Sequence, residues 1–133
     1  MRVNRVILAT AVSALAFMTG PAFADSVGEQ EYMVACAGCH GESGMGDGPF
    51  ADLLKISTPS LVGLAKANDG SFPFEAIFET IDGQDGVRAH GSAMPIWGER
   101  FQVSATSRQG ESEGMVARGR ILSLVYYLQS IQE

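Results

Sequence analysis

The sequence predicts an all-α domain of about three to five helices joined by long loops. Apolar residues recur at helical intervals in residues 27–39, 72–81 and 115–131, whereas strand-like alternation is weak throughout. Glycine and proline gather between these stretches, where they favour loops. The chain of 133 residues is long enough for one domain.

The first half of the chain is expected to alternate short helices with loops. Residues 27–39 suit a short amphipathic helix. Four glycines fall within residues 41–48, which are therefore expected to form a loop. A helical turn is expected at residues 49–54, and Pro59 marks another loop at residues 57–63.

The second half is expected to hold two longer helices. Pro73 stands near the start of the helix at residues 72–81, and Asp82-Gly83 ends it. Residues 84–98 are expected to be irregular because they contain three glycines and a proline. The polar residues 104–114 predict a surface loop. The longest helix is expected at residues 115–131, with an apolar face formed by Ile121, Leu124, Val125, Leu128 and Ile131.

The first 24 residues have the pattern of a secretory signal peptide. Two arginines come within the first five residues, residues 6–18 are nearly all apolar, and Ala22-Phe23-Ala24 supplies the small residues of a cleavage site. An uncleaved membrane anchor is the alternative, but a run of about 13 apolar residues is short of the roughly 20 that a spanning helix needs. We therefore expect cleavage after Ala24, a domain at residues 25–133, a periplasmic location and no stable membrane insertion.

Loss of the signal peptide makes the chain more acidic. The whole sequence has 9 basic and 15 acidic residues, and removal of Arg2 and Arg5 leaves 7 basic residues and a net charge of −8. This balance disfavours nucleic acid as a partner. It favours electrostatic steering toward basic patches on protein partners, with association rates that fall as salt rises.

Residues 36–40 read Cys-Ala-Gly-Cys-His, which is the attachment motif of c-type haem. Two thiols one helical turn apart can add to the two vinyl groups of a porphyrin, and the following imidazole then falls beneath the ring. We therefore expect Cys36 and Cys39 to hold one haem c covalently and His40 to bind its iron. Export supports this expectation, because haem attachment takes place outside the cytoplasm, and the sequence contains no further cysteine.

The sixth iron ligand is expected to be Met94, which lies 54 residues after His40. Pro95 follows it and glycines stand at residues 91 and 98, a composition that suits an extended loop across the distal face of a haem. A methionine thioether favours ferrous iron and raises the reduction potential. His90 is the rival ligand, four residues earlier, and the sequence leaves its role open.

With these residues in place, the chain resembles the class I cytochromes c over residues 26–132, and most of all the small periplasmic members with one haem. Family members carry a glycine eight residues before the first cysteine and an aromatic residue four before it, here Gly28 and Tyr32. The resemblance implies the cytochrome c fold, in which the last helix crosses the first closely at this glycine. The partner pattern on the last helix is matched by Leu124, Tyr127 and Leu128.

The resemblance also implies a proline whose neighbouring carbonyl accepts a hydrogen bond from Nδ1 of the haem histidine. Pro49 and Pro59 are both candidates, and the spacing slightly favours Pro49. Trp97 is expected to pack beside the haem near a propionate. Arg88 and Arg100 are candidate propionate partners, although arginines on loops are more often simply solvated.

Two departures from the family pattern stand out. Residues 104–114 form a polar insertion before the last helix. The lysine-rich docking face of mitochondrial-type members is missing, since Lys55 and Lys66 are the only lysines.

The leading hypothesis for function is a monomeric periplasmic carrier of single electrons that is not an enzyme. Its expected partners are redox proteins of a respiratory chain, such as a dehydrogenase, a quinol-oxidising complex or a terminal oxidase. A haem enzyme or gas-binding protein with a displaceable sixth ligand is the alternative. A third hypothesis, a zinc site formed by Cys36, Cys39, His40 and His90, is disfavoured because Cys39 and His40 are awkward as adjacent ligands.

Overall fold

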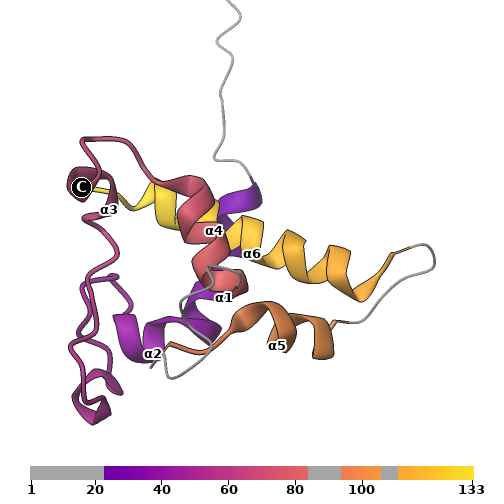
Figure 1. The fold of residues 1–133 in the computed structure, drawn as a ribbon, viewed down its shortest axis with the longest axis horizontal. Coiled ribbons are helices and arrows are strands. Elements are labelled where there is room, and N and C mark those ends of the chain that lie inside the picture. The colour runs from indigo at the N-terminus through magenta and orange to yellow at the C-terminus, as the bar shows by residue number, and fades with distance from the viewer. Residues whose placement is uncertain (1–22, 84–93, 106–110) are drawn as a thin grey trace, which may run out of the picture.

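The structure is a computed structural model, and it describes residues 23–83, 94–105 and 111–133. Within these ranges the chain forms helices and no strand, which confirms the all-α prediction (Figure 1). The helices are α1 (Phe23–Ala35), α2 (Ala37–His40), the 3-10 helix η1 (Ala51–Leu53), α3 (Leu64–Ala67), α4 (Phe74–Asp82), α5 (Trp97–Val103) and α6 (Glu113–Ser130). Two of them, α2 and α3, are single turns of four residues, and with them the helices outnumber the three to five expected.

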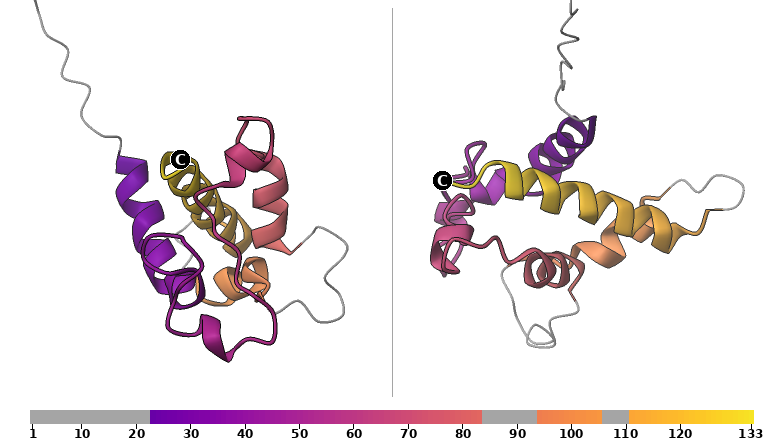
Figure 2. Two further views of the ribbon diagram at one scale, coloured as in Figure 1. Left: turned by 90° about the vertical axis from the view of Figure 1, so that its left-hand side faces the viewer. Right: turned by 90° about the horizontal axis from the view of Figure 1, so that it is seen from above.

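Helix α6 organises the fold, because α1, α4 and α5 all pack on it. In the left view of Figure 2, α6 lies between α1 and α4. Its apolar face is buried as expected, with Ile131 only partly so; the fully or nearly buried residues are Ala117, Ile121, Leu124, Val125 and Leu128. Complete burial of one such large side chain contributes about 1.5–3 kcal/mol to folding. The described core is therefore built around α6.

Gly28 allows α1 and α6 to cross closely. A Cβ atom at this position would overlap the carbonyl oxygen of Ser123 and lie 2.8 Å from Cβ of Tyr127. Tyr32, one turn further along α1, is fully buried, and its ring centroid lies 5.2 Å from that of Tyr127. The Gly28/Tyr32 pair thus packs on the last helix as the family resemblance implied.

The helix expected at residues 27–39 is interrupted at Cys36, which lies between the end of α1 and the start of α2. The amide of Cys36 still donates to the carbonyl of Tyr32, while the amides of Cys39 and His40 both donate to the carbonyl of Cys36. Gly41 then ends α2 with φ of +80°, a conformation that favours glycine. Tyr32 stabilises this turn, because its hydroxyl donates a hydrogen bond to the carbonyl oxygen of Gly41 at 2.6 Å.

Helix α5 was not predicted: its first two residues fell in the segment 84–98, which was expected to be irregular, and residues 99–103 were assigned to no element. It is only seven residues long and contains Gly98, so its sequence pattern is weak. The helix is held by packing on both α6 and α4, and Gly98 lies so close to Asp82 that a Cβ atom would be 2.6 Å from the Asp82 carbonyl oxygen. Helix α6 begins two residues earlier than expected because the Ser112 hydroxyl caps it by accepting from the amide of Met115.

Three expectations fall wholly or partly on residues outside the described ranges: the apolar run of the signal peptide, the segment that carries Arg88 and His90, and the polar loop at residues 104–114. Helix α1 begins at Phe23, so it includes the expected cleavage point after Ala24. Among the described helices, none combines the length and the apolar composition that crossing a bilayer requires.

Candidate haem site

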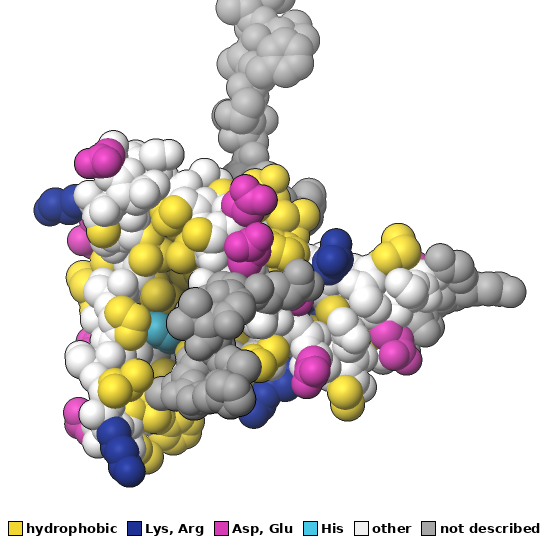
Figure 3. Space-filling model, in the orientation of Figure 1, with side chains coloured by type: hydrophobic (Ala, Val, Ile, Leu, Met, Phe, Trp, Pro, Cys, Tyr) yellow, Lys and Arg dark blue, Asp and Glu magenta, His cyan; other side chains and the backbone are white. Residues whose placement is uncertain are grey.

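The structure brings Cys36, Cys39, His40 and Met94 together at one cavity of about 250 Å³. Its lining is largely apolar and comes from the end of α1, from α2, from the loop after η1 and from the segment before α5. The other lining residues are Ala35, Leu54, Ile56, Ser57, Thr58, Pro59, Pro95 and Trp97. Figure 3 shows the one histidine side chain coloured on this face, flanked by hydrophobic side chains. The four site residues predicted from the sequence therefore share one cavity.

The two cysteines are both free thiols. Cys36 is buried at the junction of α1 and α2, and Cys39 lies one turn further along α2, partly exposed. Burial raises the pKa of the Cys36 thiol to about 12, and the nearby Glu31 and Cys39 add to this shift. Two unpaired thiols on one cavity wall have the arrangement that thioether attachment of a porphyrin requires.

His40 is oriented by a hydrogen bond from its ring to the backbone. Its Nδ1 lies 3.0 Å from the carbonyl oxygen of Pro59, and because a carbonyl only accepts, Nδ1 carries the proton. Nε2 therefore keeps its lone pair. Burial lowers the pKa of His40, although the hydrogen bond to Pro59 acts in the opposite direction. A neutral imidazole with a free Nε2 lone pair is the form that binds iron.

The preference for Pro49 as the partner of His40 was wrong. Pro49 is exposed, and its neighbours fold back on α2: the amide of Gly48 donates to the carbonyl of Cys39, and the amide of Phe50 to that of Gly38. Spacing alone did not reveal that residues 48–51 return to the backbone of α2. The chain comes back beside the His40 ring only at Pro59.

Gln132, just after α6, holds the loop that presents Pro59. Its side-chain amide donates to the carbonyl of Leu61 at 2.8 Å and accepts from the amide of Ala65 at 2.9 Å. The amide of Leu61 also donates to the carbonyl of Gly44 at 2.7 Å. Sequence reasoning missed Gln132, because a polar residue after a helix carries no signal of so distant a partner.

Met94 is partly buried and lies two residues before Ile96, which precedes α5. Trp97, the first residue of α5, also lines the cavity, and its ring centroid lies 5.5 Å from that of Phe101. The guanidinium of Arg100 lies over the Trp97 ring at 5.5 Å. Trp97 therefore stands at the cavity as expected.

The donor set fits a covalently attached haem. Two thiols, an imidazole with a free lone pair and a thioether meet in an apolar cavity. A second observation concerns Thr58, whose buried hydroxyl has no hydrogen-bond partner among the described residues. Buried polar groups are rarely left so, and a polar edge group of a bound cofactor would supply the partner. Among the described residues, no group of three or more His, Cys, Asp or Glu side chains is placed to hold a metal ion, and His90, the fourth ligand of the zinc hypothesis, lies outside them.

Comparison with known protein families shows to which family the chain belongs. Residues 26–106, more than half of the chain, match the family described as Cytochrome c. The chain belongs to the cytochrome c family. This cytochrome c therefore carries covalently bound haem c, and the family supports an electron-carrier role. The matched range ends after α5, and α6 completes the same core by packing on α1, α4 and α5. A search of curated proteins and a search of solved structures each found no match.

Proposed function

We propose that this cytochrome c is a periplasmic carrier of single electrons, with haem attached through Cys36 and Cys39 and iron held by His40 and Met94. The observation that carries the proposal is the convergence of these four side chains on one cavity. When bound, the haem supplies an iron that gains or loses one electron. The chain itself fixes the positions of the two ligands, excludes water from the site and limits the structural change that accompanies electron transfer.

Each ligand is held by its neighbours. The hydrogen bond from Nδ1 to Pro59 orients the His40 ring and fixes its tautomer. Pro95 and Trp97 restrain the segment that carries Met94, since proline fixes the backbone and α5 begins at the tryptophan. Two restrained ligands change position little when the iron changes charge, as an electron carrier requires.

The cavity lining also favours a carrier over an enzyme. Among the described residues that line it, the titratable ones are Cys36, Cys39 and His40, all used for attachment or ligation in this proposal. A general acid or base in addition to these would be expected in a haem enzyme. The alternative, an enzyme or gas-binding protein, requires a sixth ligand that an external molecule displaces readily.

Export and partner choice complete the proposal. The family match begins at residue 26, two residues after the expected cleavage point, which supports residues 1–24 as a signal peptide and 25–133 as the mature domain. A mature net charge of −8 suits docking to basic patches on dehydrogenases, quinol-oxidising complexes or terminal oxidases, with the carrier acting as a monomer. Nucleic acid is not expected as a partner.

The test is a visible spectrum of the purified secreted protein before and after addition of carbon monoxide. We expect a weak far-red sulfur-to-iron band in the oxidised state and slow, incomplete carbon monoxide binding in the reduced state. Absence of that band would remove Met94 from the iron. Rapid and complete binding of carbon monoxide would favour the enzyme or gas-binding alternative.

A further inference from the structure

Arg120, near the middle of α6, connects α6 to both α1 and α5. Its Nε and Nη2 donate to the two carboxylate oxygens of Glu31 on α1 at 2.7 and 2.8 Å. Its Nη1 donates to the hydroxyl of Ser104, which caps the end of α5, at 2.8 Å. The guanidinium also lies over the ring of Phe101 on α5, 4.2 Å from the centroid. One side chain therefore joins three helices.

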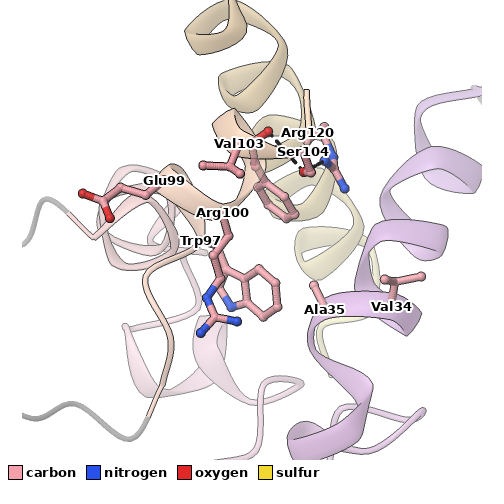
Figure 4. A pocket seen from close by; sticks show the side chains of 9 residues that line it. Val34, Ala35, Trp97, Glu99, Arg100, Val103, Ser104 and Arg120 are labelled. Atoms are coloured by element: carbon pink, nitrogen blue, oxygen red, sulfur yellow. Dashed lines mark hydrogen bonds between the residues drawn. The ribbon is translucent and has the colours of Figure 1, made fainter. Parts of the chain in front are cut away.

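This connection matters because α1 and α5 do not pack directly on each other. Helix α6 packs on both, and an open groove of about 530 Å³ lies between them (Figure 4). Val34 and Ala35 line it from α1, and Trp97 and Val103 from α5. The distance between α1 and α5 is thus set through α6, and Arg120 is bonded both to α1 and to the end of α5.

The burial and geometry of the contacts between Arg120, Glu31 and Phe101 indicate that they hold α1, α5 and α6 together strongly. The side chains of Arg120 and Glu31 are 26 % and 18 % exposed, so both are largely withdrawn from water. A two-point guanidinium–carboxylate contact is directional and stronger than a neutral hydrogen bond. Phe101 is 2 % exposed, so the cation lies over a ring that is buried in the core. An exposed single ion pair would contribute much less.

The two ends of this link lead to the two sides of the haem site. Glu31 stands five residues before Cys36 on the helix that leads into the attachment motif. Phe101 packs on Trp97, and Trp97 stands three residues after Met94. We propose that Arg120 is a positioning residue that holds the Met94 segment against the haem and so resists exchange of the sixth iron ligand. This inference rests on the proposed ligation by Met94.

The test is a titration of the oxidised holoprotein with imidazole, which displaces the sixth ligand. Loss of the far-red sulfur-to-iron band measures the displacement. We compare the wild type with Arg120→Met, Glu31→Gln and the double variant. Arg118→Met is the matched control, because Arg118 is an exposed arginine on the same helix. Ile121→Val, a buried change on α6, controls for general loss of stability, which is measured by denaturant unfolding. Mass spectrometry confirms that each variant carries haem.

The measured quantity is the midpoint, the imidazole concentration at which half of the sixth ligand is displaced. We expect Arg120→Met and Glu31→Gln each to lower this midpoint by at least about fivefold. The double variant should differ little from Arg120→Met, because the pair acts as a unit. Arg118→Met and Ile121→Val should keep the wild-type midpoint. An unchanged midpoint in Arg120→Met overturns the inference, and so does an equal shift in Ile121→Val, which would indicate a general effect of stability. A wild type without the far-red band would instead refute Met94 ligation, and the inference with it.

Discussion

His40 and Pro59 are joined by a hydrogen bond of 3.0 Å between the ring Nδ1 and the backbone carbonyl oxygen, across 19 residues of sequence. The bond fixes which ring nitrogen carries the proton and leaves Nε2 free for iron. The loop that carries Pro59 is itself tied to the C-terminus, since Gln132 bonds to Leu61 and Ala65. The orientation of the haem histidine thus depends on a loop in the middle of the domain and on a residue close to its C-terminal end.

Replacement of Pro59 by alanine should raise the reduction potential. The substitution releases the backbone restraint, weakens the hydrogen bond to His40 and so makes the imidazole a poorer donor to ferric iron. We expect a rise of a few tens of millivolts, where about 59 mV corresponds to a tenfold change for one electron. Pro49→Ala is the matched control and should leave the potential unchanged in a redox titration. A larger effect at Pro49 than at Pro59 would contradict the observed geometry.

Replacement of Met94 by alanine should leave the haem attached and lower the potential by more than about 100 mV, because the axial thioether favours ferrous iron. The reduced variant should also bind carbon monoxide quickly, since the sixth position is open. Met45→Ala is the control, because Met45 is an exposed methionine in the glycine-containing segment at residues 41–48. If the potential of Met94→Ala equals that of the wild type, another residue, such as His90, occupies the sixth position.

Replacement of Gly28 by alanine should destabilise the fold by about 1–3 kcal/mol or more, because the added Cβ meets the Ser123 carbonyl and Tyr127 at the crossing of α1 and α6. Gly119→Ala on α6 is the opposite case, since nothing lies within 4 Å of the added Cβ. It should stabilise by about 0.5–1 kcal/mol, as expected for alanine in a helix. Denaturant unfolding of the holoproteins measures both changes, and equal effects would argue against the close crossing.

Replacement of Thr58 by valine should destabilise the holoprotein by about 0.5–1.5 kcal/mol if its buried hydroxyl hydrogen-bonds to the bound cofactor. The two side chains have nearly the same shape, so packing is conserved. Ser57→Ala, an exposed neighbour that also lines the cavity, should have little effect. Unfolding experiments on both variants test this. A neutral or stabilising Thr58→Val would show that the hydroxyl gains no partner when haem is bound.

Much of the fold and site could be predicted from local sequence. Helical periodicity predicted α4 and α6, and the Cys-Ala-Gly-Cys-His motif and the methionine next to Pro95 predicted side chains that do share a cavity. These features are carried by residues close together in the chain, or by chemistry that few residue types supply. Gly28 was predicted through the family resemblance, and its contact with Ser123 supplies the physical reason.

The remainder depends on contacts between distant residues. Helix α5 is stabilised by packing such as that of Gly98 on Asp82, which its own seven residues do not reveal. The choice between Pro49 and Pro59 depended on how the loop returns to α2. The bond between Arg120 and Glu31 spans 89 residues and is visible only once α1 and α6 are side by side.

The central claim is that haem is bound covalently through Cys36 and Cys39, and intact-mass spectrometry of the purified secreted protein tests it most directly. We predict a mass equal to residues 25–133 plus one haem, and loss of that added mass when both cysteines are replaced by serine. A colourless protein with the mass of its bare polypeptide, or a double variant that keeps its haem, would contradict the claim.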